Sequence, residues 1–127
     1  MAILTASELG ERLSAKVQLR TRTIPCPEIG EGAELLVCRL TGAARVALET
    51  AFAAISEGAD SKALTKAMIV VLRECVVDES ERRILTEQRA RQLFDRYPEV
   101  AFRVRDTAME LAGMTDDEVA DLAQDFG

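Results

Sequence analysis

The spacing of apolar residues predicts a pair of short β-strands near the start of the chain. Between Lys16 and Ile24, apolar or threonine side chains alternate with polar ones. The first set is Val17, Leu19, Thr21 and Thr23, and the second is Gln18, Arg20 and Arg22. A period of two is typical of a half-buried strand. A second strand is predicted from Glu34 to Leu40, and the two should pair as an antiparallel hairpin with a long loop.

Elsewhere the apolar residues recur with the period of a helix, and capping residues mark where helices begin and end. Thr5 and Glu8 form a capping box, which predicts a short helix from about Ala6 to Ser14. A longer helix is predicted over Thr41–Ser56, with its first residue as the cap and Gly58 closing it. The hairpin is therefore expected between a short helix and a longer one.

The second half of the chain contains further helices. One is predicted from Asp60 or Ser61 to about Val76, and a polar turn follows at Asp78–Arg83. Thr86 then caps a helix with an apolar face. That face comprises Ala90, Leu93, Phe94 and Tyr97.

The last two predicted helices meet at a glycine. Pro98 suits the first turn of a helix, because its missing N–H is no loss there. Gly113 lies where a left-handed residue would end that helix, and Thr115 can cap a last one over Asp116–Gln124. The elements together predict a mainly α, α+β fold in a single domain over residues 1–127. Residues 1–40 form the first helix and the hairpin, and residues 41–127 a compact bundle of about four to five short helices.

Composition places this domain in the cytoplasm. Hydrophobic residues make up 48% of the chain and charged residues 30%, as in globular proteins. The longest apolar run, Ala67–Leu72, has six residues, whereas a membrane helix needs about 20. The first residues carry an acid before any basic cluster, unlike a secretory signal. We therefore expect no membrane association.

The residue types argue against catalysis and against metal binding. The chain has no histidine, and its three cysteines are widely spaced. Cys38 lies in a predicted strand and Cys75 on the apolar face of a helix, so both should be buried. Cys26, between two prolines, is the one expected to be exposed. We expect no catalytic residue, metal, cofactor or small-molecule substrate.

The charges have structural explanations as well. A net charge of −6 argues against nucleic-acid binding, which depends on basic residues that neutralise phosphates. Acidic residues over Asp116–Glu118 suit the positive end of a helix dipole. Seven arginines lie between Arg82 and Arg105. With Glu99 and Asp106 one turn from Arg103, they indicate a solvated face with salt bridges.

Surplus apolar residues on two adjacent helices are the strongest functional signal. Packing in the core is one explanation, and a protein-binding groove or self-association is the other. Ile69 lies on the same helix side as the charged Lys66 and Arg73, with Val70 beside it. An apolar centre with a charged rim is typical of a partner surface. The predicted protein-binding residues are therefore Ile69, Val70, Arg73 and Lys66.

Two stretches of the sequence resemble the small tail assembly chaperones of long-tailed phages and prophages. The first is LLVCRLTGAARVALETAF (Leu35–Phe52), a strand that leads into a Thr-Gly helix start. The second is Val76–Val119, where the family has a Val-Asp-Glu turn, a Thr-capped helix and an aliphatic-Gly-aliphatic-Thr corner. That corner is matched here by LAGMT, Leu111–Thr115. The chain departs at Ser80-Glu81, where the family usually has a glycine, which argues against a sharp hairpin there.

The resemblance implies a non-enzymatic function. Such chaperones bind the tape measure protein, keep it soluble in the host cell cytoplasm, help to recruit tail tube subunits, and are absent from the mature virion. Many of their genes also produce a longer form by translational frameshifting. The expected partners are thus the tape measure protein, the tail tube protein and other copies of the chain. The alternative is a small helical structural protein, such as a head–tail connector component, which purified particles would retain.

Overall fold

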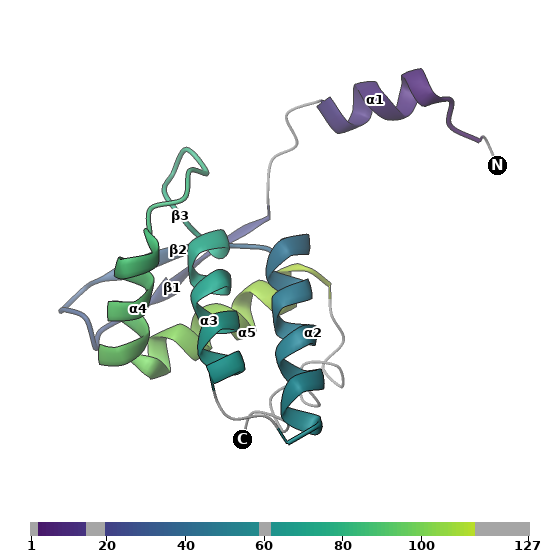
Figure 1. Ribbon diagram of the computed structural model, residues 1–127. Helices are drawn as coiled ribbons and strands as arrows, with labels where there is room; N and C mark the ends of the chain where they lie inside the picture. Colours follow the sequence, from purple (N-terminus) through teal and green to yellow (C-terminus); the bar gives the residue numbers. More distant parts are fainter. Residues whose placement is uncertain (1–2, 15–19, 59–61, 114–127) are drawn as a thin grey trace.

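A computed structural model describes residues 3–14, 20–58 and 62–113. Its elements, in chain order, are α1 (Ala6–Ser14), β1 (Thr21–Pro25), β2 (Glu34–Cys38), α2 (Gly42–Ser56), α3 (Lys62–Cys75), β3 (Val76–Val77), α4 (Glu87–Arg96) and α5 (Pro98–Leu111) (Figure 1). The predicted order of a helix, a hairpin and then helices is confirmed. Four predicted features lie outside the described residues: the start of the first strand, the helix start at Asp60 or Ser61, the cap at Thr115 and the helix over Asp116–Gln124.

The three strands form one antiparallel sheet in the order β1-β2-β3. Ile24 pairs with Leu35, and Leu36 pairs with Val77. Ile24 is the buried residue of β1, and it lies on the same side of the strand as Arg22. The side that carries the arginines is thus the covered one, and Thr21 and Thr23 are exposed.

Arg22 can lie on the covered side because its charged end reaches an acidic partner. Its Nη1 lies 2.7 Å from Oε2 of Glu110 on α5. A long arginine side chain covers apolar surface with its methylene groups while the guanidinium stays at the edge in water. Apolar alternation alone therefore does not identify the inner side of this strand.

The third strand and the turn after it differ from the sequence prediction. Val76–Val77 extends beyond the end of α3 and pairs with β2, although the sequence suggested the end of a helix. A tight turn follows, because Oδ1 of Asp78 accepts hydrogen bonds from the backbone N–H groups of Ser80 (2.8 Å) and Arg82 (3.0 Å). Glu81 adopts the left-handed conformation with φ of 65°. A sharp turn therefore forms here although the chain has Ser80-Glu81 in place of a glycine, and the doubt about the hairpin is removed.

Predicted caps define the helices. The Thr41 hydroxyl accepts a hydrogen bond from the Ala44 N–H at 3.2 Å, and the Thr86 hydroxyl accepts one from the Arg89 N–H at 3.2 Å. Gly113 ends α5 with φ of 77°, as the sequence predicted. No helix in the described part of the chain is long and apolar enough to cross a membrane.

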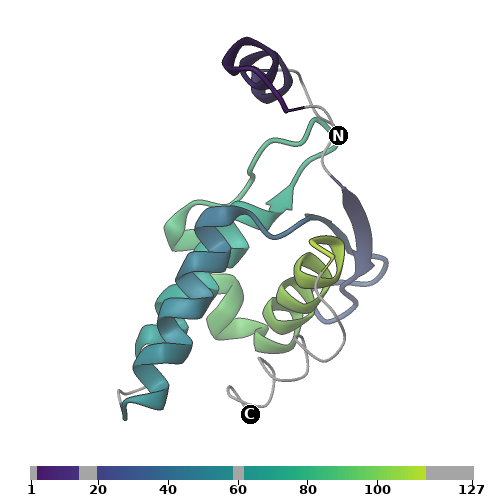
Figure 2. The same cartoon turned by 90° about the vertical axis from the view of Figure 1, so that its right-hand side faces the viewer.

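The helices pack in two layers. α3 lies between α2 and α4, and α5 crosses behind them (Figure 1). Figure 2 shows α5 lying between the α2–α3 pair and the hairpin. α5 contacts β1, β2, α3 and α4, and the Leu40 N–H donates a hydrogen bond to the Ala108 carbonyl in α5 at 2.9 Å. The core between the layers includes the fully buried Val37, Met68, Leu72, Val100 and Val104.

α1 stands apart from these layers (Figure 1). The threonine half of its predicted capping box forms, because the Glu8 N–H donates to Oγ1 of Thr5 at 3.1 Å. Oε1 of Glu8 accepts from the Thr5 hydroxyl at 3.2 Å and not from the Thr5 backbone N–H. None of its nine residues is buried. Leu9 and Leu13 are 45% and 76% exposed. The local capping residues therefore define a helix that has no buried residue.

Candidate protein-binding site

Ile69, which the sequence places on an exposed surface, is buried in the structure. Its side chain is only 4% exposed and belongs to the core. α3 is covered by α2 and α4 on its flanks and by α5 behind, so only a narrow stripe of it faces solvent. Ile69 lies at the margin of the charged side, where the neighbouring helices cover it. The prediction that it is solvent-facing is wrong.

The other three predicted residues share one stripe on the uncovered side of α3. Lys66, Val70 and Arg73 are spaced i, i+4 and i+7, which places them on one helix face. Lys66 and Arg73 are exposed, and Val70 is half-buried. Within the described part of the chain, neither Lys66 nor Arg73 forms an ion pair. The stripe therefore has an apolar centre with a cation on either side.

Beside this stripe, α2 and α3 enclose an open apolar groove of about 260 Å³. Eight residues line it: Ala47, Thr50, Ala51 and Ala54 from α2, and Ala63, Lys66, Ala67 and Val70 from α3. We call these residues the α2–α3 groove. Its walls are mostly alanine, and such short side chains leave the space between the two helix backbones unfilled. Val46, 62% exposed, lies one turn before Thr50 on α2.

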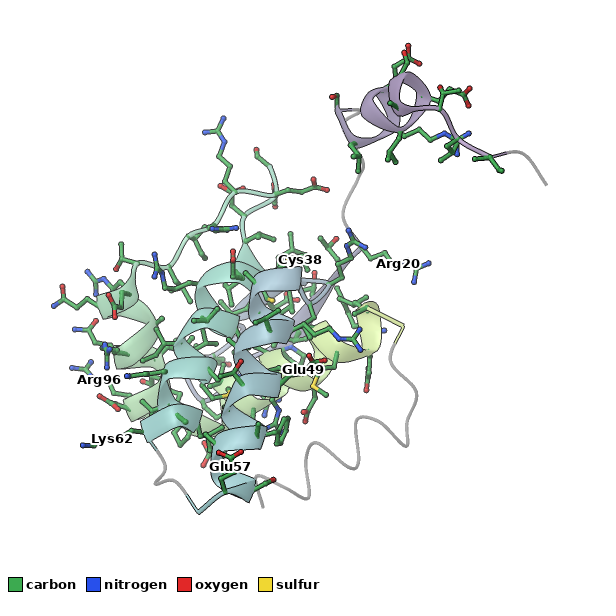
Figure 3. The ribbon with its side chains drawn as sticks, turned by 45° about the vertical axis from the view of Figure 1, so that its right-hand side comes forward. Arg20, Cys38, Glu49, Glu57, Lys62 and Arg96 are labelled. Atoms are coloured by element: carbon green, nitrogen blue, oxygen red, sulfur yellow. The ribbon has the colours of Figure 1, made fainter. Side chains whose placement is uncertain are left out.

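Figure 3 shows one end of this helix pair. Glu57, just beyond α2, and Lys62, the first residue of α3, lie at the same end. Glu49 lies on the outer side of α2, where its Oε1 accepts a hydrogen bond from Nε of Arg45 at 3.1 Å. This is the i,i+4 pair that forms the narrow polar stripe of α2. The groove side of α2 is left to small and apolar residues.

The three cysteines are all buried, and the prediction of an exposed Cys26 is wrong. Its side chain has no exposed area, because the hairpin loop folds back onto α5. Burial raises the pKa of the Cys26 thiol. Cys38 and Cys75 are buried as predicted. A hydrogen bond with Cys38, together with burial, raises the pKa of Cys75. Cys26 and Cys75 are therefore held in the protonated form, which is a poor nucleophile.

The arginine-rich stretch forms ion pairs, though not all with the predicted partners. Arg91 pairs with Glu87 at 3.1 Å, as expected for a solvated face. Arg83 pairs with Glu74 of α3, whose side chain is only 12% exposed. Arg103 was expected to pair within its own helix, but its Nη2 lies 2.9 Å from Oε2 of Glu28 in the hairpin loop. The arginines therefore serve tertiary structure as well as surface charge.

Arg105 is a further exception, because it is only 7% exposed. Its guanidinium lies 5.0 Å from the centre of the Phe102 ring and 2.9 Å from Oδ1 of Asp106. A cation over an aromatic ring keeps a favourable electrostatic partner when it leaves water. No group of three or more His, Cys, Asp or Glu side chains in residues 3–14, 20–58 and 62–113 is placed to hold a metal ion.

The described elements form an antiparallel sheet begun by a hairpin, with α5 across it and α2, α3 and α4 outside. A similar solved structure is the bacteriophage HK97 tail assembly chaperone, with a TM-score of 0.59 and 18% sequence identity. The match covers 88% of this chain and 100% of that chain. At this identity the likeness concerns the fold. No protein-family model matches the sequence, and neither does any curated protein.

Proposed function

We propose that this protein is a non-enzymatic phage tail assembly chaperone. The observation that carries the proposal is the likeness in fold to the HK97 tail assembly chaperone along that protein's whole length. The sequence alone also supports the proposal, because the stretches Leu35–Phe52 and Val76–Val119 resemble the same family. The protein then acts in the host cell cytoplasm and is absent from the mature virion.

The partner in this proposal is the tape measure protein. A long helix with a sustained apolar seam aggregates unless that seam is covered. The α2–α3 groove suits such a seam, because its alanine walls allow a second helix to approach closely. Apolar surface removed from water contributes about 25 cal/mol per Å². Lys66 and Arg73 on the rim then face acidic residues that flank the seam.

Tail tube recruitment is the second part of the proposed function. A chaperone that keeps the tape measure soluble also holds it where tube subunits can polymerise around it. The groove accounts for the first task, and any surface left free after binding is available for the second. In this scheme tube assembly displaces the chaperone.

Co-expression with the tape measure protein of the same phage or prophage tests the proposal. The parent should keep the tape measure protein in the soluble fraction. Thr50→Arg, at an exposed groove position, should abolish this effect and leave the thermal melt unchanged. Ile84→Arg is the matched control, because Ile84 is 49% exposed and lies outside the groove. A tape measure protein that stays insoluble with the parent, or a chain retained in purified particles, would contradict the proposal.

A further inference from the structure

Two of the three buried cysteines lie opposite each other, where β2 and α3 end. Val37 pairs with Val76 in the antiparallel ladder between β2 and β3. One step further along this register, Cys38, the last residue of β2, faces Cys75, the last residue of α3. The Cα atoms of opposite residues in such a ladder lie about 4.5–5.5 Å apart, and a disulfide spans roughly 4.4–6.8 Å. The backbone therefore allows a bond between these two residues.

The hydrogen bonds of the two thiols show that the side chains also meet. Sγ of Cys38 donates to the carbonyl of Glu74 at 3.5 Å, and Sγ of Cys75 donates to the carbonyl of Arg39 at 3.9 Å. Each thiol thus reaches the residue beside the other cysteine, and the two thiols are hydrogen-bonded to each other as well. Figure 3 shows Cys38 near the upper ends of α2 and α3.

This contact makes the two thiols chemically unequal. The hydrogen bond with Cys75 lowers the pKa of the Cys38 thiol. The hydrogen bond with Cys38, followed by burial, raises the pKa of the Cys75 thiol. Of the two, Cys38 is therefore the one that forms a thiolate, which is the form that reacts with an oxidant. Cys26 lies outside this pair, and burial raises the pKa of its thiol.

We infer that Cys38 is a site of oxidation by hydroperoxides, and that Cys75 converts the oxidised form into a reversible disulfide. Cys38 is only 1% exposed, but hydrogen peroxide is small and uncharged and reaches side chains that exclude larger reagents. In a reducing cytoplasm, protein disulfides are typically transient and redox-sensing. This inference goes beyond the proposed function and stands whether or not the chain serves a phage tail.

The oxidation proceeds in two steps. The Cys38 thiolate attacks one oxygen of hydrogen peroxide, the O–O bond breaks, and Cys38 becomes a sulfenic acid. The hydroxide that leaves takes up the proton that the Cys38 thiol had released. Sγ of Cys75 then attacks Sγ of Cys38, so that the S–S bond forms, the S–O bond breaks, and water leaves with the proton of Cys75. Two thiols and one peroxide thus give one disulfide and two waters, and a dithiol reductant reverses the change by thiol–disulfide exchange.

The disulfide closes a loop that contains both α2 and α3. A cross-link of this kind removes extended conformations from the unfolded chain, and the effect grows with the length of the loop. Oxidation therefore holds the α2–α3 pair, and the groove between its helices, against the end of β2. We expect the oxidised chain to melt roughly 10 °C or more above the reduced chain.

Peroxide treatment of the reduced, full chain tests the inference. The remaining thiols are alkylated in denaturant, and the digested chain is analysed by mass spectrometry. Trypsin leaves Cys26 and Cys38 together in Thr23–Arg39, so a glutamate-specific protease is added to cut between them after Glu34. We expect a Cys38–Cys75 link that dithiothreitol removes, with Cys26 alkylated.

Serine variants assign the roles of the two thiols. Cys75→Ser keeps a hydrogen-bond donor beside Cys38 but cannot form the disulfide, so dimedone should trap a sulfenic acid on Cys38. Cys38→Ser should leave Cys75 unmodified at the same dose of peroxide. Cys26→Ser is the matched control and should form the disulfide as the parent does.

Four results would overturn the inference. The first is a disulfide that includes Cys26, and the second is a parent chain that keeps three alkylatable thiols after treatment. The third is equal trapping of sulfenic acid in Cys75→Ser and Cys38→Ser. The fourth is an oxidised chain that melts below the reduced one, because the native fold then does not accommodate the bond. The digest of the parent is decisive even where a serine variant fails to fold.

Discussion

The guanidinium of Arg103, in the middle of α5, binds the carboxylate of Glu28 in the hairpin loop. Nη2 lies 2.9 Å from Oε2 of Glu28, and Nη1 lies 3.3 Å from Oε1, so the contact is two-pronged. The same Nη1 donates a hydrogen bond to the Pro25 carbonyl at 2.9 Å. Paired N–H···O bonds fix orientation as well as distance. One side chain therefore holds the loop against the helix.

The first prediction concerns acid stability. Hydrogen bonding to Arg103 lowers the pKa of Glu28 from its ordinary value of 4.5. Because the pKa is lower in the folded state, the stabilisation is fully present above about pH 4.5 and is lost as the pH falls through the folded-state value. Glu28→Gln should melt earlier than the parent at neutral pH, and the two melting curves should converge in acid.

The control for this prediction is Glu31→Gln, in the same loop at an exposed position. It should melt with the parent throughout the titration. A Glu28→Gln variant that is equally displaced at every pH would show that the carboxylate charge is irrelevant. Differential scanning calorimetry between pH 2 and pH 7 measures both variants.

The second prediction concerns Ile69. Ile69→Asp should destabilise the fold by about 3 kcal/mol or more, because it places an unpaired charge in the core. Lys66→Asp, one turn earlier on the exposed stripe, is the matched substitution and should stay within about 0.5 kcal/mol of the parent. Urea unfolding followed by circular dichroism measures both. Equal stability of the two variants would mean that Ile69 is not a core residue.

Thiol reactivity provides the third prediction. All three cysteines are buried and burial raises the pKa of Cys26, so a disulfide reagent should label none of them rapidly in the native protein. Three equivalents should react after unfolding. Leu13→Cys, at a position that is 76% exposed, should add one fast-reacting thiol and confirm that the reagent is active. Fast labelling of Cys26 would show that the hairpin loop opens.

The fourth prediction tests the end of α5. Gly113→Ala should cost about 1 kcal/mol, because alanine pays a steric penalty at φ of 77°. An added Cβ would meet no atom within 4 Å at Gly113, so crowding does not contribute. Gly42→Ala also meets no atom within 4 Å, but at a helical position, and it should be neutral or slightly stabilising. Equal unfolding midpoints would mean that the left-handed stop is absent in solution.

Local signals account for the parts of the fold that the sequence predicts. Thr41 and Thr86 cap helices because a hydroxyl satisfies N–H groups only three residues away. Gly113 ends α5 because glycine readily adopts the positive φ of a left-handed helix stop. Such choices depend on a few neighbouring residues and are readable without the rest of the chain.

The errors concern residues whose environment comes from distant parts of the chain. Ile69 is buried because three other helices, α2, α4 and α5, pack around α3. Cys26 is buried because its loop is held by Arg103 of α5. The two-residue strand Val76–Val77 exists because β2 offers it an edge to pair with. No periodicity within a single segment carries this information.

The sequence predicts only part of the candidate site, because the rest also depends on distant parts of the chain. Lys66, Val70 and Arg73 share a stripe that helical periodicity predicts. The groove beside them requires the alanines of α2 to lie opposite those of α3. The sequence shows an excess of alanine on two consecutive helices. This excess is compatible both with a close helix contact and with an open groove.

The hydrogen bond from the Leu40 N–H to the Ala108 carbonyl has a consequence for synthesis on the ribosome. α5 contacts β1, β2, α3 and α4, so the apolar surface that these described elements bury against α5 stays exposed until α5 is present. The layers around α5 can therefore be completed only when residues up to about Leu111 have left the exit tunnel. Folding of this layer structure is then a late event, and a stalled or shortened translation product that lacks α5 becomes a substrate for proteases.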